Sequence, residues 1–148
     1  MVLLVGLVGL RLSVIDLAEH RLPDRLTFPL FGSLVTMTLA GGSAESARGA
    51  LVGSLATGAM LWVLAVIPGK PLGMGDVKFQ FSLGWLLGCV DPALALMGVA
   101  LTFVTGGLSV LPALFRRRTG LSDPIALGPW MMVATCCVAL GIGSPKII

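Results

Sequence analysis

Long apolar runs separated by short polar breaks form the main pattern along this chain. Proline, glycine and charged residues fill the breaks, as is usual where helices stop and turns form. Several runs are shorter than the ~20 residues that an untilted helix needs to cross a bilayer, and flanking residues lengthen the second, third and fourth. We therefore expect about six transmembrane helices in one polytopic bundle, a single domain over residues 1–148. The runs cover residues 2–17, 26–40, 51–67, 77–90, 93–115 and 125–142.

Composition supports a membrane environment. Of the 148 residues, 56% are hydrophobic and 11% are charged, whereas a soluble domain carries about twice that fraction of charge. The 20 glycines agree with transmembrane packing, in which small residues let helix backbones approach each other closely. The chain is thus predicted to be an all-α integral membrane protein with the lipid bilayer as its surroundings.

The basic residues indicate an orientation rather than a nucleic-acid partner. The formal charge of +3 arises from residues that fall between the apolar runs and form no basic stripe. If the breaks after the first, third and fifth runs share one side, that side holds seven basic residues and the other holds two, which predicts that the first side is cytoplasmic. The seven are Arg21, Arg25, Lys70, Lys78, Arg116, Arg117 and Arg118, and the two are Arg48 and Lys146; Arg11 lies inside the first run and is not counted.

Two aspartates stand at the edges of apolar runs. Asp16 lies near the end of the first run and Asp76 lies at the start of the fourth. Carboxylates at membrane depth are costly, and they usually mark functional sites. Because two membrane crossings separate these aspartates, both reach the same side of the bilayer. We therefore predict that Asp16 and Asp76 share one depth and form a catalytic pair.

Such a pair suits aspartic protease chemistry. Two close carboxyl groups in a low-dielectric site do not both ionise easily, so one keeps a proton while the other is a carboxylate. The carboxylate activates a water molecule for attack on a peptide carbonyl, and the acid protonates the leaving nitrogen. No metal or cofactor is required. Since Asp76 begins its helix and Asp16 ends its own, the helix dipoles predict that Asp16 is the protonated partner.

Glycines flank the second aspartate. Gly73 and Gly75 in the run Gly-Met-Gly-Asp are free in φ and have no side chain, so another chain can approach their backbone. Irregular backbone at membrane depth is tolerated where it is buried in protein or lines a wet cavity. We expect non-helical backbone at Gly73 and Gly75 that binds an extended substrate.

Together these motifs resemble the type IV prepilin leader peptidases, a family of GxGD intramembrane aspartic proteases. The family shows an aspartate followed by Leu/Ile-Pro-Asp/Asn, then a Gly-x-Gly-Asp-x-Lys block, then a Gly-Pro block that opens the last helix. In this chain the blocks are Asp16 with Leu22-Pro23-Asp24, then Gly73-Met74-Gly75-Asp76-Val77-Lys78, then Gly128-Pro129.

The resemblance implies a function. Asp16 and Asp76 would be the catalytic residues, and the substrate would be the leader of a type IV prepilin or pseudopilin, cut at the cytoplasmic face of a bacterial or archaeal inner membrane. Asp24 would be structural, and Lys78 lies on another face of its helix. Larger relatives carry an additional domain with paired cysteines and also methylate the new N-terminus. This chain resembles the short protease-only branch, so methyltransferase activity is not expected.

Other functions were weighed against the protease. His20 is the single histidine, which excludes HExxH zinc chemistry. The three cysteines form no CxxC pair, so we interpret them as small buried hydrophobic residues. A small proton-coupled transporter or ion-pathway subunit, with Asp16 and Asp76 as proton relays, is the main alternative from another class. An inactive scaffold in a pilus assembly complex is a third.

Overall fold

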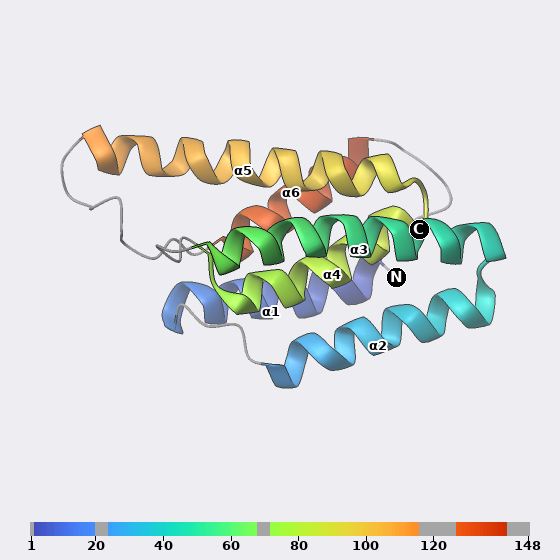
Figure 1. Ribbon diagram of the computed structural model, residues 1–148. Coiled ribbons are helices and arrows are strands. Elements are labelled where there is room, and N and C mark those ends of the chain that lie inside the picture. The colour runs from blue at the N-terminus through green and yellow to red at the C-terminus, as the bar shows by residue number, and fades with distance from the viewer. Residues whose placement is uncertain (1, 20–23, 68–71, 116–126, 142–148) are drawn as a thin grey trace.

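A computed structural model describes residues 2–19, 24–67, 72–115 and 127–141 of the chain. Within these ranges the protein is all-helical, with six helices and no strand. Consecutive helices run in alternate directions, so all six lie along one bundle (Figure 1). The predicted all-α fold with six helices is confirmed. The helices are α1 (Val2–Glu19), α2 (Asp24–Gly41), α3 (Ala44–Val66), α4 (Met74–Gly88), α5 (Pro92–Phe115) and α6 (Gly128–Gly141).

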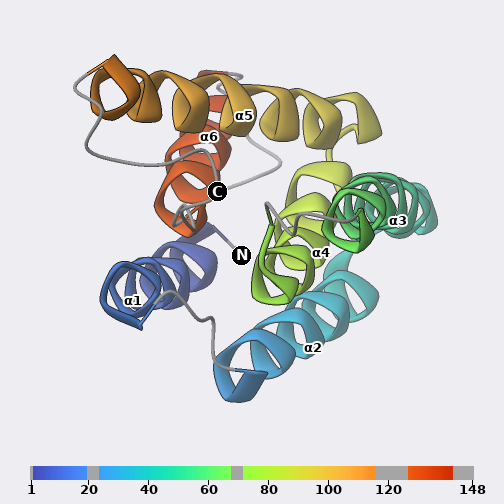
Figure 2. The same ribbon diagram turned by 60° about the vertical axis from the view of Figure 1, so that its left-hand side comes forward.

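Helix α4 is the central element of the bundle. It packs against α2, α3, α5 and α6, and Figure 2 shows it between α2, α3 and α5. Eleven of its residues between Asp76 and Gly88 are buried, including Phe79, Leu83 and Leu87, whose exposed fractions do not exceed 1%. The fourth apolar run forms α4, a continuous helix that starts at Met74 and includes Gly75, where non-helical backbone was expected.

Glycines set the distance between α3 and α4. A Cβ atom added at Gly49 would meet the carbonyl oxygen of Gly88, and one added at Gly53 would lie 2.8 Å from the carbonyl oxygen of Gly84. The backbones of the two helices are therefore in direct contact at two levels, as small residues allow. This contact fixes the position of α4, and with it Asp76, relative to α3.

Polar side chains join α4 to α2 and close the turn before α5. The Trp85 indole donates a hydrogen bond to Thr38 Oγ1 at 3.0 Å, and its ring meets Phe31 edge-on with 5.6 Å between centroids. At the end of α4, Asp91 Oδ1 accepts a hydrogen bond of 2.8 Å from the Ala93 backbone amide. Asp91 thus caps α5, which Pro92 begins, as aspartate and proline do at helix starts.

The outer surface of the bundle is strongly apolar. Large hydrophobic side chains are exposed on all six helices, for example Leu7 on α1 and Leu140 on α6. Within the described ranges, α3 is long and apolar enough to cross a membrane, whereas Leu26–Gly41, Pro92–Leu108 and Gly128–Gly141 are apolar but shorter. Polar groups such as Thr57, Gln80 and Ser82 are buried instead, which is the reverse of the distribution in a soluble domain.

The structure locates some of the charged residues and cysteines discussed above. Arg11 lies within α1 and is exposed on the surface of the bundle, so it does not face the interior. Cys137 is also exposed, and Cys89 and Cys136 are half-buried, so the expectation of buried cysteines is wrong for Cys137. Most of the basic residues used for the orientation lie outside the described residues, namely Arg21, Lys70, Arg116, Arg117, Arg118 and Lys146.

Candidate active site

Asp16 and Asp76 lie at the same end of the bundle. Asp16 is near the end of α1, and Asp76 is the third residue of α4. In Figure 1 α1 ends, and α4 and α6 begin, at the left-hand end of the bundle. Both carboxyl groups are buried, with exposed fractions of 4% for Asp16 and 6% for Asp76. The two aspartates thus lie at one end of the bundle, and their common depth in a membrane stays a prediction.

The two carboxyl groups are near enough to influence each other electrostatically. Asp16 exerts an electrostatic repulsion on Asp76, although 60 residues of sequence separate them. Repulsion between buried carboxyl groups is strong because little solvent screens it, and a pair of this kind accommodates one proton more readily than two negative charges.

The start of α4 orients Asp76. Gly73 is the N-cap residue, with φ −74° and ψ 142°, and its carbonyl accepts a hydrogen bond of 3.1 Å from the Asp76 amide. The Asp76 carboxyl in turn forms a hydrogen bond with the Gly73 backbone. An acidic residue three positions after the N-cap makes this reciprocal contact in a capping box. Asp76 Oδ1 is buried and has no hydrogen-bond partner among the described residues.

This geometry corrects the expected role of the glycines. Gly75 lies within the first turn of α4, so non-helical backbone at Gly75 was a wrong prediction. Gly73 is extended, but its negative φ is one that any residue can adopt. What Gly73 provides is space, because a Cβ atom there would lie 3.3 Å from Asp76 Oδ2. Substrate binding by Gly73 and Gly75 stays a prediction.

Asp16 is oriented by a different helix. Its Oδ2 accepts a hydrogen bond of 3.0 Å from the Gly128 backbone amide, across a sequence separation of 112 residues. Gly128 is the first residue of α6, and the first amides of a helix have no partner within that helix. A Cβ atom at Gly128 would lie 2.8 Å from the same oxygen, so a larger residue there would displace the Asp16 carboxyl group.

Gly128 is the site residue that reasoning from sequence did not assign. The Gly-Pro pair at the start of the last apolar run was visible as a motif, but nothing in the sequence placed its amide against Asp16. The dipole argument for Asp16 had counted only the helix that carries it. The structure adds the N-terminus of α6, which favours a negative charge at Asp16.

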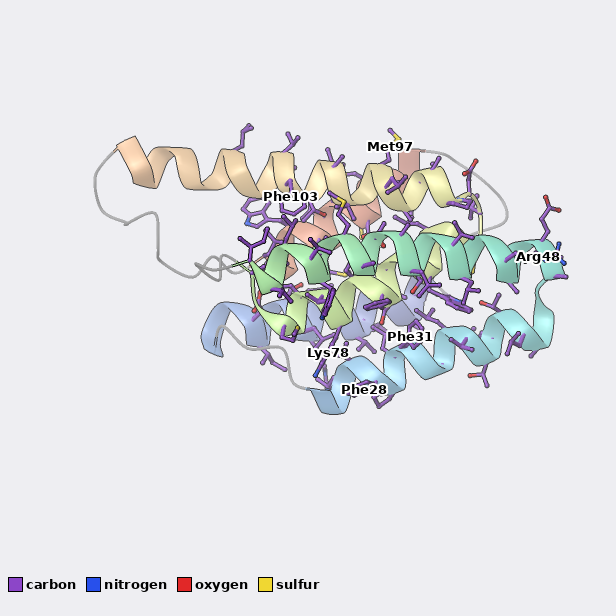
Figure 3. All side chains as sticks on the ribbon, viewed as in Figure 1. Phe28, Phe31, Arg48, Lys78, Met97 and Phe103 are labelled. Atoms are coloured by element: carbon purple, nitrogen blue, oxygen red, sulfur yellow. The ribbon has the colours of Figure 1, made fainter. Side chains whose placement is uncertain are left out.

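Lys78 lies outside this carboxyl pair. Its Nζ is 5.3 Å from the centroid of the Phe28 ring on α2, and Figure 3 shows the side chain directed toward that ring. This contact agrees with the prediction that Lys78 and Asp76 lie on different faces of α4. Asp24 begins α2, and its side chain lies outside the described part of the chain. No cluster of three or more potential metal ligands occurs among the described residues.

Comparison with known proteins identifies relatives along most of the chain. Residues 2–111 match the Type IV leader peptidase family. A protein of Aeromonas salmonicida named prepilin leader peptidase/N-methyltransferase is 31% identical over 136 residues, which cover 89% of this chain and 46% of the relative. A protein of the same name from Burkholderia pseudomallei is 33% identical over 142 residues, covering 92% of this chain and 44% of the relative. The chain spans about half the length of these curated relatives. No solved structure matches the chain.

Proposed function

Because the chain belongs to the type IV leader peptidase family, we propose that it is an intramembrane aspartic endopeptidase. Its substrate is the leader peptide of a type IV prepilin or pseudopilin. The observation that carries this proposal is the pair of buried, mutually repelling carboxyl groups of Asp16 and Asp76 at one end of the bundle. Burying two acids together is unfavourable for folding, and the cost is understandable where they perform chemistry.

The reaction needs only the two side chains and water. One carboxylate accepts a proton from a water molecule, and the resulting nucleophile attacks the carbonyl carbon of the scissile bond. The protonated partner donates to the developing oxyanion. Collapse of the tetrahedral intermediate then breaks the C–N bond, and the leaving nitrogen takes the proton that the base had removed from water. The burial of both groups supports this scheme, because electrostatic stabilisation is stronger where water is excluded.

The proposed setting is a multi-pass position in the cytoplasmic membrane. The exposed hydrophobic side chains on all six helices support it, since contiguous apolar surface of this kind marks contact with lipid or protein. The excess of basic residues in the breaks at the dyad's end supports a position of the site at the cytoplasmic face. An active site there meets the leader of a prepilin on the cytoplasmic side of its hydrophobic segment.

The proposal covers the peptidase reaction. The relatives carry both peptidase and N-methyltransferase in their names, and this chain matches less than half of their length. The dyad explains peptide hydrolysis, whereas transfer of a methyl group requires a donor site that Asp16 and Asp76 do not form. Methyltransferase activity is therefore no part of the proposed function.

Cleavage of a type IV prepilin by the purified protein in vesicles tests this function. N-terminal sequencing of the product locates the cut. We expect Asp16→Asn and Asp76→Asn each to lower the rate by about 10²–10⁴-fold while remaining folded. Asp91→Asn is the matched control, because Asp91 is exposed at the opposite end of the bundle and asparagine also caps helices.

Two results would contradict the proposal. A dyad variant that cuts the same bond at the wild-type rate excludes that residue from catalysis. A wild-type protein that cuts none of several prepilin leaders refutes the peptidase function. The alternative of a proton pathway through Asp16 and Asp76 is then tested by measuring proton flux across vesicles that contain the wild type or either Asn variant.

A further inference from the structure

The contact between Asp16 and α6 gives the two aspartates different surroundings. A backbone amide can only donate a hydrogen bond, so the Oδ2 atom that receives the Gly128 amide carries no proton. On the other side of the pair, Asp76 Oδ1 is buried without a partner among the described residues. An oxygen in that position is able to carry a proton and to donate it.

We propose that the backbone amide of Gly128 is a positioning group that holds Asp16 as the ionised base, and that Asp76 is the acid that donates its proton to the developing oxyanion. This inference rests on the proposed peptidase function and assigns roles within it. It reverses the assignment that the sequence predicted from the dipoles of α1 and α4. Gly128 itself touches neither water nor substrate in this scheme, and it acts through Asp16.

The physical basis is the strength of a hydrogen bond to a charged acceptor. Such bonds are about twice as strong as bonds between neutral groups, and the N-terminus of α6 adds a favourable dipole. The contact is buried, so solvent screens neither term. Asp76 also begins a helix and bonds to Gly73, but this leaves one of its oxygens without a partner. In the proposal the shared proton is accordingly assigned to Asp76 Oδ1.

On its own helix, Asp16 is accompanied by the ionisable residues Arg11 and Glu19. Helix α6 packs against α1 and carries no acidic or basic residue, and its cysteines Cys136 and Cys137 lie two turns beyond Gly128. Helix α2 also packs against α1, and its charged residues are Asp24 and Arg25 at its start. Asp76 faces Asp16 from α4. The pH profile of a variant is therefore compared with that of the wild type, so that ionisable groups common to both do not affect the difference.

The decisive variant replaces the backbone amide of residue 128 by an ester. Cell-free translation with glycolic acid at this position exchanges the N–H for an oxygen and keeps the shape of glycine. This amide belongs to the first turn of α6, so no hydrogen bond within the helix is lost. We expect kcat for prepilin cleavage to fall by about tenfold to a hundredfold with KM within twofold of the wild type. The acidic limb of the kcat profile should move to higher pH, because the anion of Asp16 loses its donor.

Gly128→Ala provides a second variant. Its Cβ atom would lie 2.8 Å from Asp16 Oδ2, so we expect kcat to fall at least tenfold. Gly141→Ala in the same helix is the control, since a Cβ atom there meets nothing within 4 Å, and it should cut like the wild type. Melting temperatures of all variants show whether the fold is kept.

The outcomes are distinct. If the wild type cuts prepilin and the ester variant matches its kcat and its pH profile, the role of Gly128 is refuted while the peptidase function stands. If the ester variant loses activity but its pH profile is unmoved, the amide does not control the ionisation of Asp16 and the assignment of base and acid is wrong. A wild type that cuts no prepilin refutes the peptidase function itself.

Discussion

Gly88→Ala tests whether direct contact between the backbones of α3 and α4 holds the bundle together. A Cβ atom at position 88 would lie 2.6 Å from the carbonyl oxygen of Gly49 and 3.0 Å from the Cα atom of Ala50. Both atoms belong to the backbone of α3, so no side chain can rotate to relieve the overlap. The two helices have to separate instead, and the neighbouring contact between Gly53 and Gly84 is weakened with them.

The size of the effect follows from two opposing terms. Forcing an extra methyl group into a packed interface costs about 1–3 kcal/mol, and we expect the upper half of this range because backbone meets backbone. Alanine favours a helix over glycine by about 1 kcal/mol, which offsets part of this cost. The net loss of stability for Gly88→Ala is therefore about 1–2 kcal/mol.

Gly32→Ala isolates the packing term. Gly32 lies in α2, and a Cβ atom there meets nothing within 4 Å. This control should gain about 1 kcal/mol from helix propensity alone. Unfolding of both variants by sodium dodecyl sulfate in mixed micelles, followed by tryptophan fluorescence, measures the difference. If Gly88→Ala proves as stable as Gly32→Ala, the close approach of α3 and α4 is wrong.

Three further substitutions probe single contacts. Ser82→Ala should leave the free energy of unfolding unchanged or raise it by about 1 kcal/mol, because the fully buried Ser82 hydroxyl has no partner among the described residues. A clear loss of stability in the same micelle titration would mean that the hydroxyl does form a hydrogen bond. Gly73→Ala should lower kcat several-fold with an unchanged melting temperature, since the added methyl group lies 3.3 Å from Asp76 Oδ2 while the backbone suits alanine; wild-type kcat would mean that Asp76 tolerates displacement. Phe28→Leu should cost about 0.5–1 kcal/mol by removing the ring next to Lys78, and a double-mutant cycle with Lys78→Met should give a coupling energy of that size; a coupling energy near zero would mean that the ring contact contributes nothing.

The helices were largely predictable from the apolar pattern. The six runs foretold six helices because a segment that meets lipid must satisfy its backbone hydrogen bonds internally, and a helix does so locally. Their ends shifted by a few residues, since caps such as Ser43 and Asp91 are local interactions that hydropathy does not register. The expectation of non-helical backbone at Gly75 was wrong for a related reason. Glycine permits an irregular backbone but does not impose one, and Gly75 is helical.

The sequence by itself determined the family, the all-α fold and the shared end of the two aspartates. Each of these depends on order along the chain: the run of motifs, the alternation of apolar and polar segments, and the even number of crossings between Asp16 and Asp76. Only the tertiary structure decided what surrounds each carboxyl group. The Gly128 amide reaches Asp16 across 112 residues, and such a contact depends on how α1 and α6 pack. Sequence spacing fixes which end of a helix a residue occupies, whereas packing in three dimensions decides which donor or acceptor meets it there.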